Sequence, residues 1–319
     1  MRRALILGLS VVGLLVLASC ENTFSPKGPY TEELVVYSIL STRSDAQYVR
    51  VYATYNPSGF NPLEQTTDTF VRNAQITITS GPDVYHLRDT TIKRVDQSRY
   101  TDDLAAYIGF PMPVRPGETY SLSVSTDRGT VEATATVPGN GSVTAHNPYV
   151  FKDPERYGED ISATIYLSPI AFGYLVRIYI NFEYFAGGTW KPGRAEVPIS
   201  TAALPNGEDQ LNYPRLTRRA QAPSGPAQTI YFPIGAYEIF LTQLQNQYGG
   251  AGTMHILSAT FILTQVEPNL YKYFNIVNGF QDEFSIRTDL PDFTNIQGGV
   301  GVFGAMTEDS VVADLTQFQ

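Results

Sequence analysis

Glycines near the C-terminus form the one pattern in this chain that matches a cofactor-binding loop. Residues 299–304 have the sequence Gly-Val-Gly-Val-Phe-Gly, which fits G-x-G-x-x-G letter for letter. A dinucleotide site needs a strand before this loop, a helix after it to meet the pyrophosphate, and an acidic residue about 20 positions later. The chain ends at residue 319, only 15 residues after Gly304. We therefore interpret the glycines as structural: they let the backbone approach a neighbouring strand, while the valines between them fill the core.

The histidines and the known catalytic motifs give no second site. His86, His146 and His255 lie far apart, with no carboxylate or further histidine at a metal-ligand spacing. The motifs H-E-x-x-H and G-x-S-x-G are both absent from the sequence. Carboxylates from distant loops could still assemble a glycosidase site. We predict no metal, no cofactor and no enzymatic activity, with a hydrolase as the least favoured alternative.

The single cysteine lies at the end of a secretory signal. Arg2 and Arg3 precede an apolar run over residues 4–18, and Ser19 and Cys20 close it. This order is that of a bacterial signal peptide. The run is shorter than the roughly 20 apolar residues that cross a bilayer. We predict that the signal is cleaved between Ser19 and Cys20.

The residues around this cleavage position point to a lipid anchor. Leu17-Ala18-Ser19-Cys20 resembles the lipobox of bacterial lipoproteins, whose cysteine is lipidated and becomes the mature N-terminus. A lone thiol in an exported protein has no disulfide partner, and a thioether to diacylglycerol would use it. Several acyl chains on one residue also exceed the weak hold of a single chain. We assign residues 1–20 to a lipoprotein signal peptide and lipidation to Cys20; the alternative is a plain secretory signal with a chance cysteine.

Two further features could contact a partner. Trp190, the only tryptophan, lies in the turn-rich stretch 187–193, where an exposed indole could stack on a sugar or anchor a protein. Packing across the end of the sandwich is the favoured alternative, because large aromatic residues are usually mostly buried. Arg215, Arg218 and Arg219 lie within five positions and could meet an acidic partner. A solvated loop is the favoured alternative there, because charge clusters are common on surfaces.

Composition excludes some partners and favours strands. The chain of 319 residues has 22 Lys and Arg against 31 Asp and Glu, a formal net charge of -9. Nucleic acid and bare anionic membrane are therefore excluded as expected partners. It has 21 Tyr and 17 Phe but only 17% charged residues, which suits strands better than helix bundles. Because long charged tracts are absent, we expect a folded body.

Alternating apolar and polar residues predict a first, all-strand domain. Residues 21–32 carry prolines and glycine with little apolar content, which is typical of a flexible tether. The clearest hairpin spans residues 120–137 and turns at Asp127-Arg128-Gly129, where the glycine allows a positive φ. Further strand patterns, each with one buried and one wet face, cover residues 34–40, 49–55 and 74–79. We predict an immunoglobulin-like β-sandwich of about seven strands over residues 33–138.

The remaining residues, 142–319, predict a second mostly-β domain with one or two short helices. The longest strand pattern covers residues 174–185, and because both of its faces are partly apolar we expect it to be central in its sheet. Helical spacing predicts a helix over residues 236–248 and a shorter one beginning at Pro268. A long loop is expected over residues 201–229, strand over 254–266, and a final strand over 295–306.

Three stretches together resemble a family of Bacteroidota lipoproteins known as domain of unknown function 4249. They are Leu-Ala-Ser-Cys-Glu at 17–21, Pro-Gly-Glu-Thr-Tyr-Ser-Leu-Ser-Val at 116–124 leading to Ala-Thr-Val-Pro at 135–138, and Asn-Ile-Gln-Gly-Gly-Val-Gly-Val-Phe-Gly-Ala at 295–305. Members of such families tend to be encoded beside outer-membrane receptors of the TonB-dependent type. The resemblance implies an accessory role in substrate capture or receptor assembly, and no catalytic residues.

These observations favour an outer-membrane lipoprotein of the cell envelope that serves as a noncatalytic accessory to a TonB-dependent nutrient receptor. Glu21 is the only acidic residue between Cys20 and Thr31, which leaves the choice between periplasmic and surface leaflet open. The alternative is a stand-alone cell-surface binding or adhesion module that uses exposed aromatic residues such as Trp190.

Overall fold

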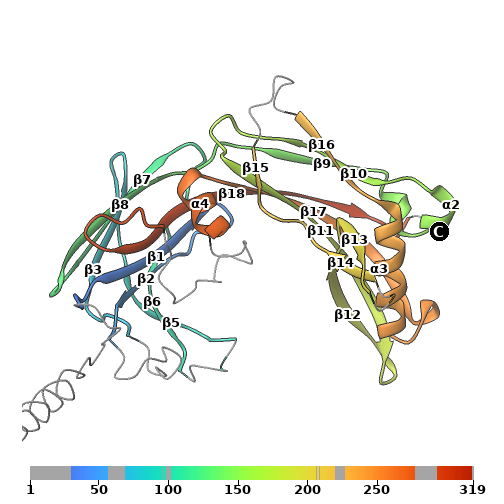
Figure 1. Ribbon diagram of the computed structural model, residues 1–319, viewed down its shortest axis with the longest axis horizontal. Helices are drawn as coiled ribbons and strands as arrows, with labels where there is room; N and C mark the ends of the chain where they lie inside the picture. Colours follow the sequence, from blue (N-terminus) through green and yellow to red (C-terminus); the bar gives the residue numbers. More distant parts are fainter. Residues whose placement is uncertain are drawn as a thin grey trace, which may run out of the picture.

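The computed structural model describes residues 30–56, 69–95, 97, 102–205, 207, 209–219, 227–276 and 293–317. Two lobes lie side by side along the long axis of the molecule, and long strands run from one into the other (Figure 1). The fold is mainly β, as predicted. None of the helices in these ranges has the length and apolarity that a membrane crossing requires.

One sheet joins the two lobes. Within the described residues it has nine strands, in the order β12-β11-β17-β18-β1-β2-β6-β5, with β15 paired to β11. β1 and β18 are parallel, whereas β1 and β2 are antiparallel, as are β17 and its neighbours β11 and β18. The bounds are β1 Leu34–Ser41, β2 Gln47–Ala53, β5 Arg88–Ile92, β6 Leu104–Gly109, β11 Gly173–Ala186, β12 Thr189–Glu196, β15 Thr217–Arg218, β17 Met254–Val266 and β18 Val300–Asp314.

A second sheet packs on the joining sheet in the first lobe and completes the expected sandwich. Its order is β4-β3-β7-β8. The predicted hairpin is confirmed, because Val131, Ala133 and Ala135 on β8 are buried while Glu132 and Thr134 between them are exposed. The bounds are β3 Gln75–Ser80, β4 Asp83–His86, β7 Thr119–Thr126 and β8 Gly129–Thr136.

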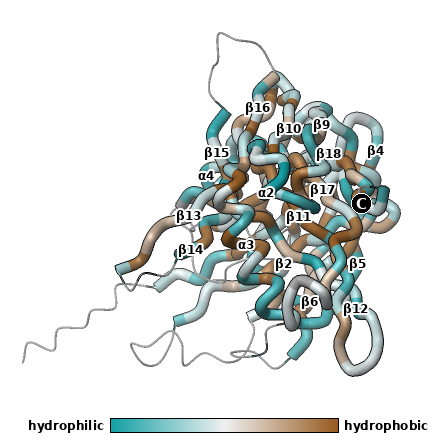
Figure 2. Tube along the Cα trace, turned by 90° about the vertical axis from the view of Figure 1, so that its right-hand side faces the viewer, coloured by the Kyte–Doolittle hydropathy of each residue, from teal (hydrophilic) through white to brown (hydrophobic). Residues whose placement is uncertain are grey.

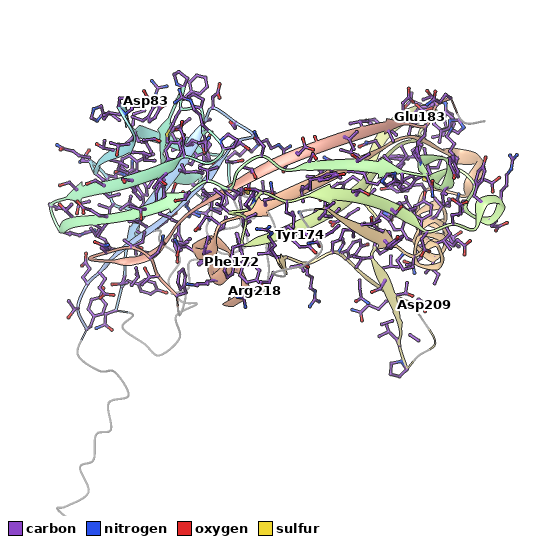
Figure 3. The ribbon with its side chains drawn as sticks, turned by 90° about the horizontal axis from the view of Figure 1, so that it is seen from above. Asp83, Phe172, Tyr174, Glu183, Asp209 and Arg218 are labelled. Atoms are coloured by element: carbon purple, nitrogen blue, oxygen red, sulfur yellow. The ribbon has the colours of Figure 1, made fainter. Side chains whose placement is uncertain are left out.

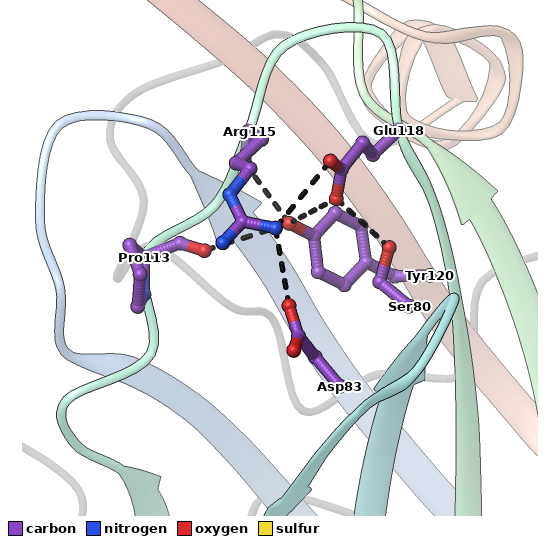
Figure 4. Close-up of polar contacts among 6 residues, drawn as sticks. All are labelled: Ser80, Asp83, Pro113, Arg115, Glu118 and Tyr120. Carbon is purple, nitrogen blue, oxygen red and sulfur yellow. Dashed lines mark hydrogen bonds and ion pairs between the residues drawn. The ribbon is translucent and has the colours of Figure 1, made fainter.

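A buried tyrosine holds the loop that enters β7 (Figure 4). The Tyr120 hydroxyl accepts a hydrogen bond from the backbone N–H of Arg115 at 2.9 Å. The Arg115 guanidinium lies 3.1 Å from Asp83 and 3.6 Å from Glu118. A tyrosine hydroxyl bonded to backbone a few residues upstream is the tyrosine corner found in immunoglobulin-type sandwiches. The hydrogen bond between Tyr120 and the Arg115 backbone therefore supports the assignment of this lobe as a sandwich.

In the second lobe, a three-stranded sheet and a helix cover the joining sheet. The sheet order is β16-β10-β9, and the helix α3 buries Tyr237, Phe240, Leu241 and Leu244 in the core beside β11 and β17. Figure 2 shows apolar stretches of β10, β11 and α3 toward the middle of the view. The bounds are β9 Ser142–His146, β10 Ile161–Tyr166, β13 Ser200–Ala203, β14 Asp209–Asn212, β16 Ala227–Phe232, η2 Pro148–Phe151, α2 Pro154–Tyr157, α3 Ile234–Gln247 and η3 Ala251–Thr253.

The helix α4, Pro268–Ile276, covers the opposite face of the joining sheet. Leu270 and Tyr273 on this helix pack with Tyr37 of β1 and Met306 of β18. Sequence alternation predicts one wet face for β2, and this is wrong: Arg50 and Tyr52 are each only 5% exposed. The reason is that Tyr52 belongs to the core beneath α4, so β2 is buried on both faces.

The last strand confirms the structural interpretation of the glycines and extends further than expected. A Cβ at Gly301 would collide with the carbonyl oxygen of Val36, and one at Gly299 would lie 2.6 Å from that of Leu34. Strand β18 begins at Val300 and continues to Asp314, beyond the predicted end at 306, because β17 pairs with it over that length. The predicted division into two domains at residues 138–142 stays a prediction. Phe303 and Ala305, which belong to the predicted second domain, lie in the core of the first lobe.

The stretch 201–229 is not a structureless loop. It contains the hairpin of β13 and β14, the short strand β15, and the start of β16. The sequence does not predict these elements, because prolines and glycines lie between them and each strand is too short to show an alternation of apolar and polar residues. Residues 174–185 are confirmed as an inner strand, because β11 lies between β12 and β17. The two predicted helices are confirmed as α3 and α4.

Candidate binding groove

A groove of about 480 Å³ opens on the second lobe. It lies between the start of β11, strand β16, and the segments on either side of the β13–β14 hairpin. Its lining residues are Tyr174, Val176, Ile199, Ser200, Asn212, Tyr213, Pro214, Arg215, Thr217 and Ile230. A concave and mostly apolar surface with a few polar groups is the usual form of a small-molecule site.

Strand pairing positions the walls of the groove. Tyr174 and Val176 are two residues apart on β11 and so point to the same face. The Tyr174 hydroxyl donates to Gln228 Oε1 at 3.0 Å, which ties β11 to β16. Ser200 lies opposite Asn212 in the hairpin, which fixes both on one wall.

The guanidinium of Arg215 is unpaired within the described part of the chain, although the hydroxyls of Tyr174 and Thr217 in the same lining are hydrogen-bonded. Arg215 is exposed, and its guanidinium has no ion pair or hydrogen bond to described residues. Its backbone is held by Thr217, whose hydroxyl donates to the Arg215 carbonyl at 3.1 Å. Burial, and then the nearby charge of Glu196, raise the pKa of Tyr213. This hydroxyl is therefore a protonated donor at neutral pH.

The carboxylate whose charge acts on Tyr213 is already compensated. The Glu196 carboxylate lies 3.3 Å from the Arg177 guanidinium, and the two side chains are 22% and 19% exposed. Burial raises the pKa of Glu196, while Arg177 and Arg194 lower it. The negative charge of Glu196 is thus matched by cations on β11 and β12. Among the described residues, Arg215 has no such counter-charge.

The structure separates the three predicted arginines. Arg218 lies on β15 with its guanidinium carbon 5.1 Å from the centre of the Phe172 ring. Arg219 donates to the carbonyl oxygen of Pro169. Figure 3 places Phe172, Tyr174 and Arg218 together near the middle of the molecule. Only Arg215 lines the groove, so the cluster seen in the sequence is not one site.

Trp190 lies far from the groove. It pairs with Phe185 across the β11–β12 turn, 11 residues along β11 from Tyr174, or roughly 36 Å at about 3.3 Å per residue. Trp190 is 43% exposed on β12, at one end of the strand order of the joining sheet, so it is not mostly buried as the packing alternative expects. Its ring stacks on His255 with centroids 4.3 Å apart. His255 in turn contacts Glu183, which Figure 3 places toward the end of the second lobe.

The other predicted residues are not gathered into a site. His86 lies on β4 and His146 at the end of β9, where its ring is 2.9 Å from the Thr164 hydroxyl. No set of three His, Cys, Asp or Glu side chains within the described ranges could hold a metal ion. The lipidation and cleavage residues, Cys20 and Ser19, lie outside the described residues.

Sequence reasoning missed most of the groove. Tyr174 was recognised only as a strand residue, and Ser200, Asn212 and Tyr213 were assigned to a loop or given no role. The available signal was the spacing of Asn212, Tyr213 and Arg215, a polar and aromatic set directly after a short strand. It is too common a pattern to identify a site without the fold.

Comparisons with known proteins add a family but no activity. A family model described as "Domain of unknown function (DUF4249)" matches residues 21–311. A search of curated proteins finds no match. The C-terminal globular domain of an oligosaccharyltransferase from Pyrococcus abyssi matches at 12% identity over 73% of this chain and 48% of its own, with a TM-score of 0.23. A DUF4785 family protein from Legionella pneumophila matches at 8% identity over 73% and 51%, with a TM-score of 0.19. The chain thus spans about half the length of each structure.

Proposed function

We propose, from the premise that the chain belongs to the family described as domain of unknown function DUF4249, that it is a noncatalytic binding protein anchored by lipid in the bacterial outer membrane. Cys20 is the anchoring residue in this proposal. The partner is a nutrient receptor of the TonB-dependent type, for which the protein captures substrate or assists assembly.

The observation that carries the binding role is the groove beside β11. It combines an apolar lining with polar side chains and one cation, Arg215, that has no ion pair to any residue in the described ranges. Groups of this kind fix the orientation of a ligand. Catalysis needs in addition a nucleophile or acid–base pair in mutual contact, and no His lines the groove.

The test uses the full chain, tagged at its C-terminus, in its native membrane. We expect radiolabelled palmitate on the wild-type protein and recovery of a large outer-membrane receptor after detergent solubilisation. Cys20→Ala should lose the label and leave the membrane fraction, because no other cysteine can carry the lipid. Ser25→Ala in the tether is the matched control and should behave as wild type.

Two results would contradict the proposal. One is a Cys20→Ala protein that stays labelled and membrane-bound. The other is a wild-type pull-down without receptor under conditions that preserve known receptor complexes.

A stand-alone adhesion module is the second candidate. The exposed aromatic residues at the β11–β12 turn favour it, since Phe185 is 46% and Trp190 is 43% exposed. Binding of the intact protein to glycans without any receptor in the pull-down would support this candidate over the first.

A further inference from the structure

We propose that the groove binds a small organic carboxylate with an apolar body, and that Arg215 pairs with the carboxylate. The inference rests on the binding role proposed above and names the chemical class of its ligand.

The apolar part of the ligand follows from the lining. Val176, Ile199 and Ile230 come from three separate segments, and the rings of Tyr174 and Tyr213 with Pro214 extend the same surface. A volume of about 480 Å³ falls within the usual range of small-molecule sites, roughly 300–1,000 Å³. A ligand that is polar throughout would leave these side chains without matching contacts.

The charge of the ligand follows from Arg215. A guanidinium offers a planar fork of donors that matches a carboxylate in two parallel hydrogen bonds. Arg215 has no such partner among described residues, and Glu196 is occupied by Arg177 at 3.3 Å. A single guanidinium at the groove favours a ligand that places one negative group at this position.

The remaining polar groups can orient the ligand. The Tyr213 hydroxyl is protonated at neutral pH because burial raises its pKa, so it can donate. Asn212 and Ser200 are paired across the hairpin, and neither side chain makes a hydrogen bond to described residues. Three donors of this kind beside a guanidinium suit the oxygens of a carboxylate and a neighbouring polar substituent.

The experiment compares two probes of one shape, 2-naphthylacetate and its neutral amide, by ligand-observed NMR on the purified full chain. We expect the carboxylate to bind about tenfold more tightly than the amide, which corresponds to one charge-assisted pair. Arg215→Gln should remove this preference and leave amide binding unchanged. Arg218→Gln, three residues away and stacked on Phe172, is the matched control and should keep the preference.

Equal binding of the two probes, an unchanged preference in Arg215→Gln, or no binding of either probe at millimolar concentration would each overturn the inference. The proposed function fails in a different way. Arg215→Gln leaves Cys20 unchanged. Loss of receptor from the pull-down of both wild type and Arg215→Gln would therefore contradict the proposed partner, whereas the preference between the two probes tests only the groove.

Discussion

Glu267 is a carboxylate held at the start of α4 with almost no contact with solvent. It is 2% exposed, and its oxygens accept hydrogen bonds from the backbone N–H groups of Asn269 and Leu270 at 2.8 and 2.7 Å. Accepting these bonds caps the helix, whose first N–H groups have no partner inside it. Burial raises the pKa of Glu267 to about 7, although the capping N–H groups and that of Ala305 lower it. Burial therefore dominates at this carboxyl group.

This pKa predicts a pH dependence of stability. The folded protein binds the Glu267 proton more tightly than the unfolded chain, whose ordinary pKa is 4.5. The stabilisation is fully present below pH 4.5 and is lost as the pH rises through about 7. At 1.36 kcal/mol per pKa unit, the free energy of unfolding should fall by on the order of 3 kcal/mol across this window. Urea unfolding at several pH values measures it.

The contribution of Glu267 is isolated by substitution. Glu267→Gln keeps an oxygen that can accept from Leu270 but does not titrate, so the fall in stability between pH 4.5 and 7 should be smaller by about that amount. Glu155→Gln on the exposed surface of α2 is the control and should follow wild type. Parallel pH profiles for wild type and Glu267→Gln would refute the assignment.

At the scale of elements, the contact between β1 and β18 depends on glycine. The two strands run parallel with Val36 opposite Gly301, and a Cβ at Gly301 would collide with the Val36 backbone. Gly301 also has a φ of 119°, which side-chain-bearing residues rarely adopt. We expect Gly301→Ala to lower the free energy of unfolding by about 2 kcal/mol or more, measured by urea unfolding.

The corresponding glycine-to-alanine substitution at Gly235 should raise the free energy of unfolding instead of lowering it. A Cβ at Gly235 meets no atom within 4 Å, and this residue lies in the first turn of α3. Gly235→Ala is expected to stabilise the protein by about 0.5–1 kcal/mol, because alanine restricts the unfolded chain. If Gly301→Ala were as stable as wild type, the close approach of the two strands would be disproved.

These elements were largely predictable, and the groove was not. Residues 254–266 are predicted as a strand with both ends correct, because β17 is rich in apolar branched and aromatic residues, with glycines shortly before it and Pro268 shortly after it. The buried state of Tyr52 was not predictable, because it packs in one core with residues of α4, which lies more than 200 residues later in the chain. Arg215 was selected by its type, but its separation from Arg218 depends on the pairing of β15 with β11. The alternation of apolar and polar residues along a segment predicts its strands, whereas the composition of a binding site depends on which distant strands pair with one another.

At the scale of the whole molecule, a buried glutamine joins the two lobes. Gln265 on β17 is 1% exposed and accepts a hydrogen bond from the Ser168 N–H at 2.7 Å. Its amide donates to Thr307 on β18 at 3.1 Å and to the carbonyl of Gly139 at 3.3 Å. Gly139 belongs to the segment between β8 of the first lobe and β9 of the second. The Gln265 side chain therefore holds both this connecting segment and β18, which runs through both lobes.

Removal of this amide should loosen the junction without disturbing either core. Gln265→Leu keeps a similar volume but leaves the buried Ser168 N–H without its acceptor and the Gly139 carbonyl with only the 3.5 Å contact from Thr307, at a cost of about 1–3 kcal/mol. We expect faster hydrogen exchange in peptides that contain residues 139–141 and 168, and unchanged exchange in β3 and β7 of the first sandwich. Gln210→Leu, at an exposed residue of β14, is the control and should alter neither region.

Because β18 contributes to the cores of both lobes, wild type should still unfold in a single transition. Independent unfolding of the lobes, or unchanged exchange at the junction in Gln265→Leu, would show that Gln265 does not couple them.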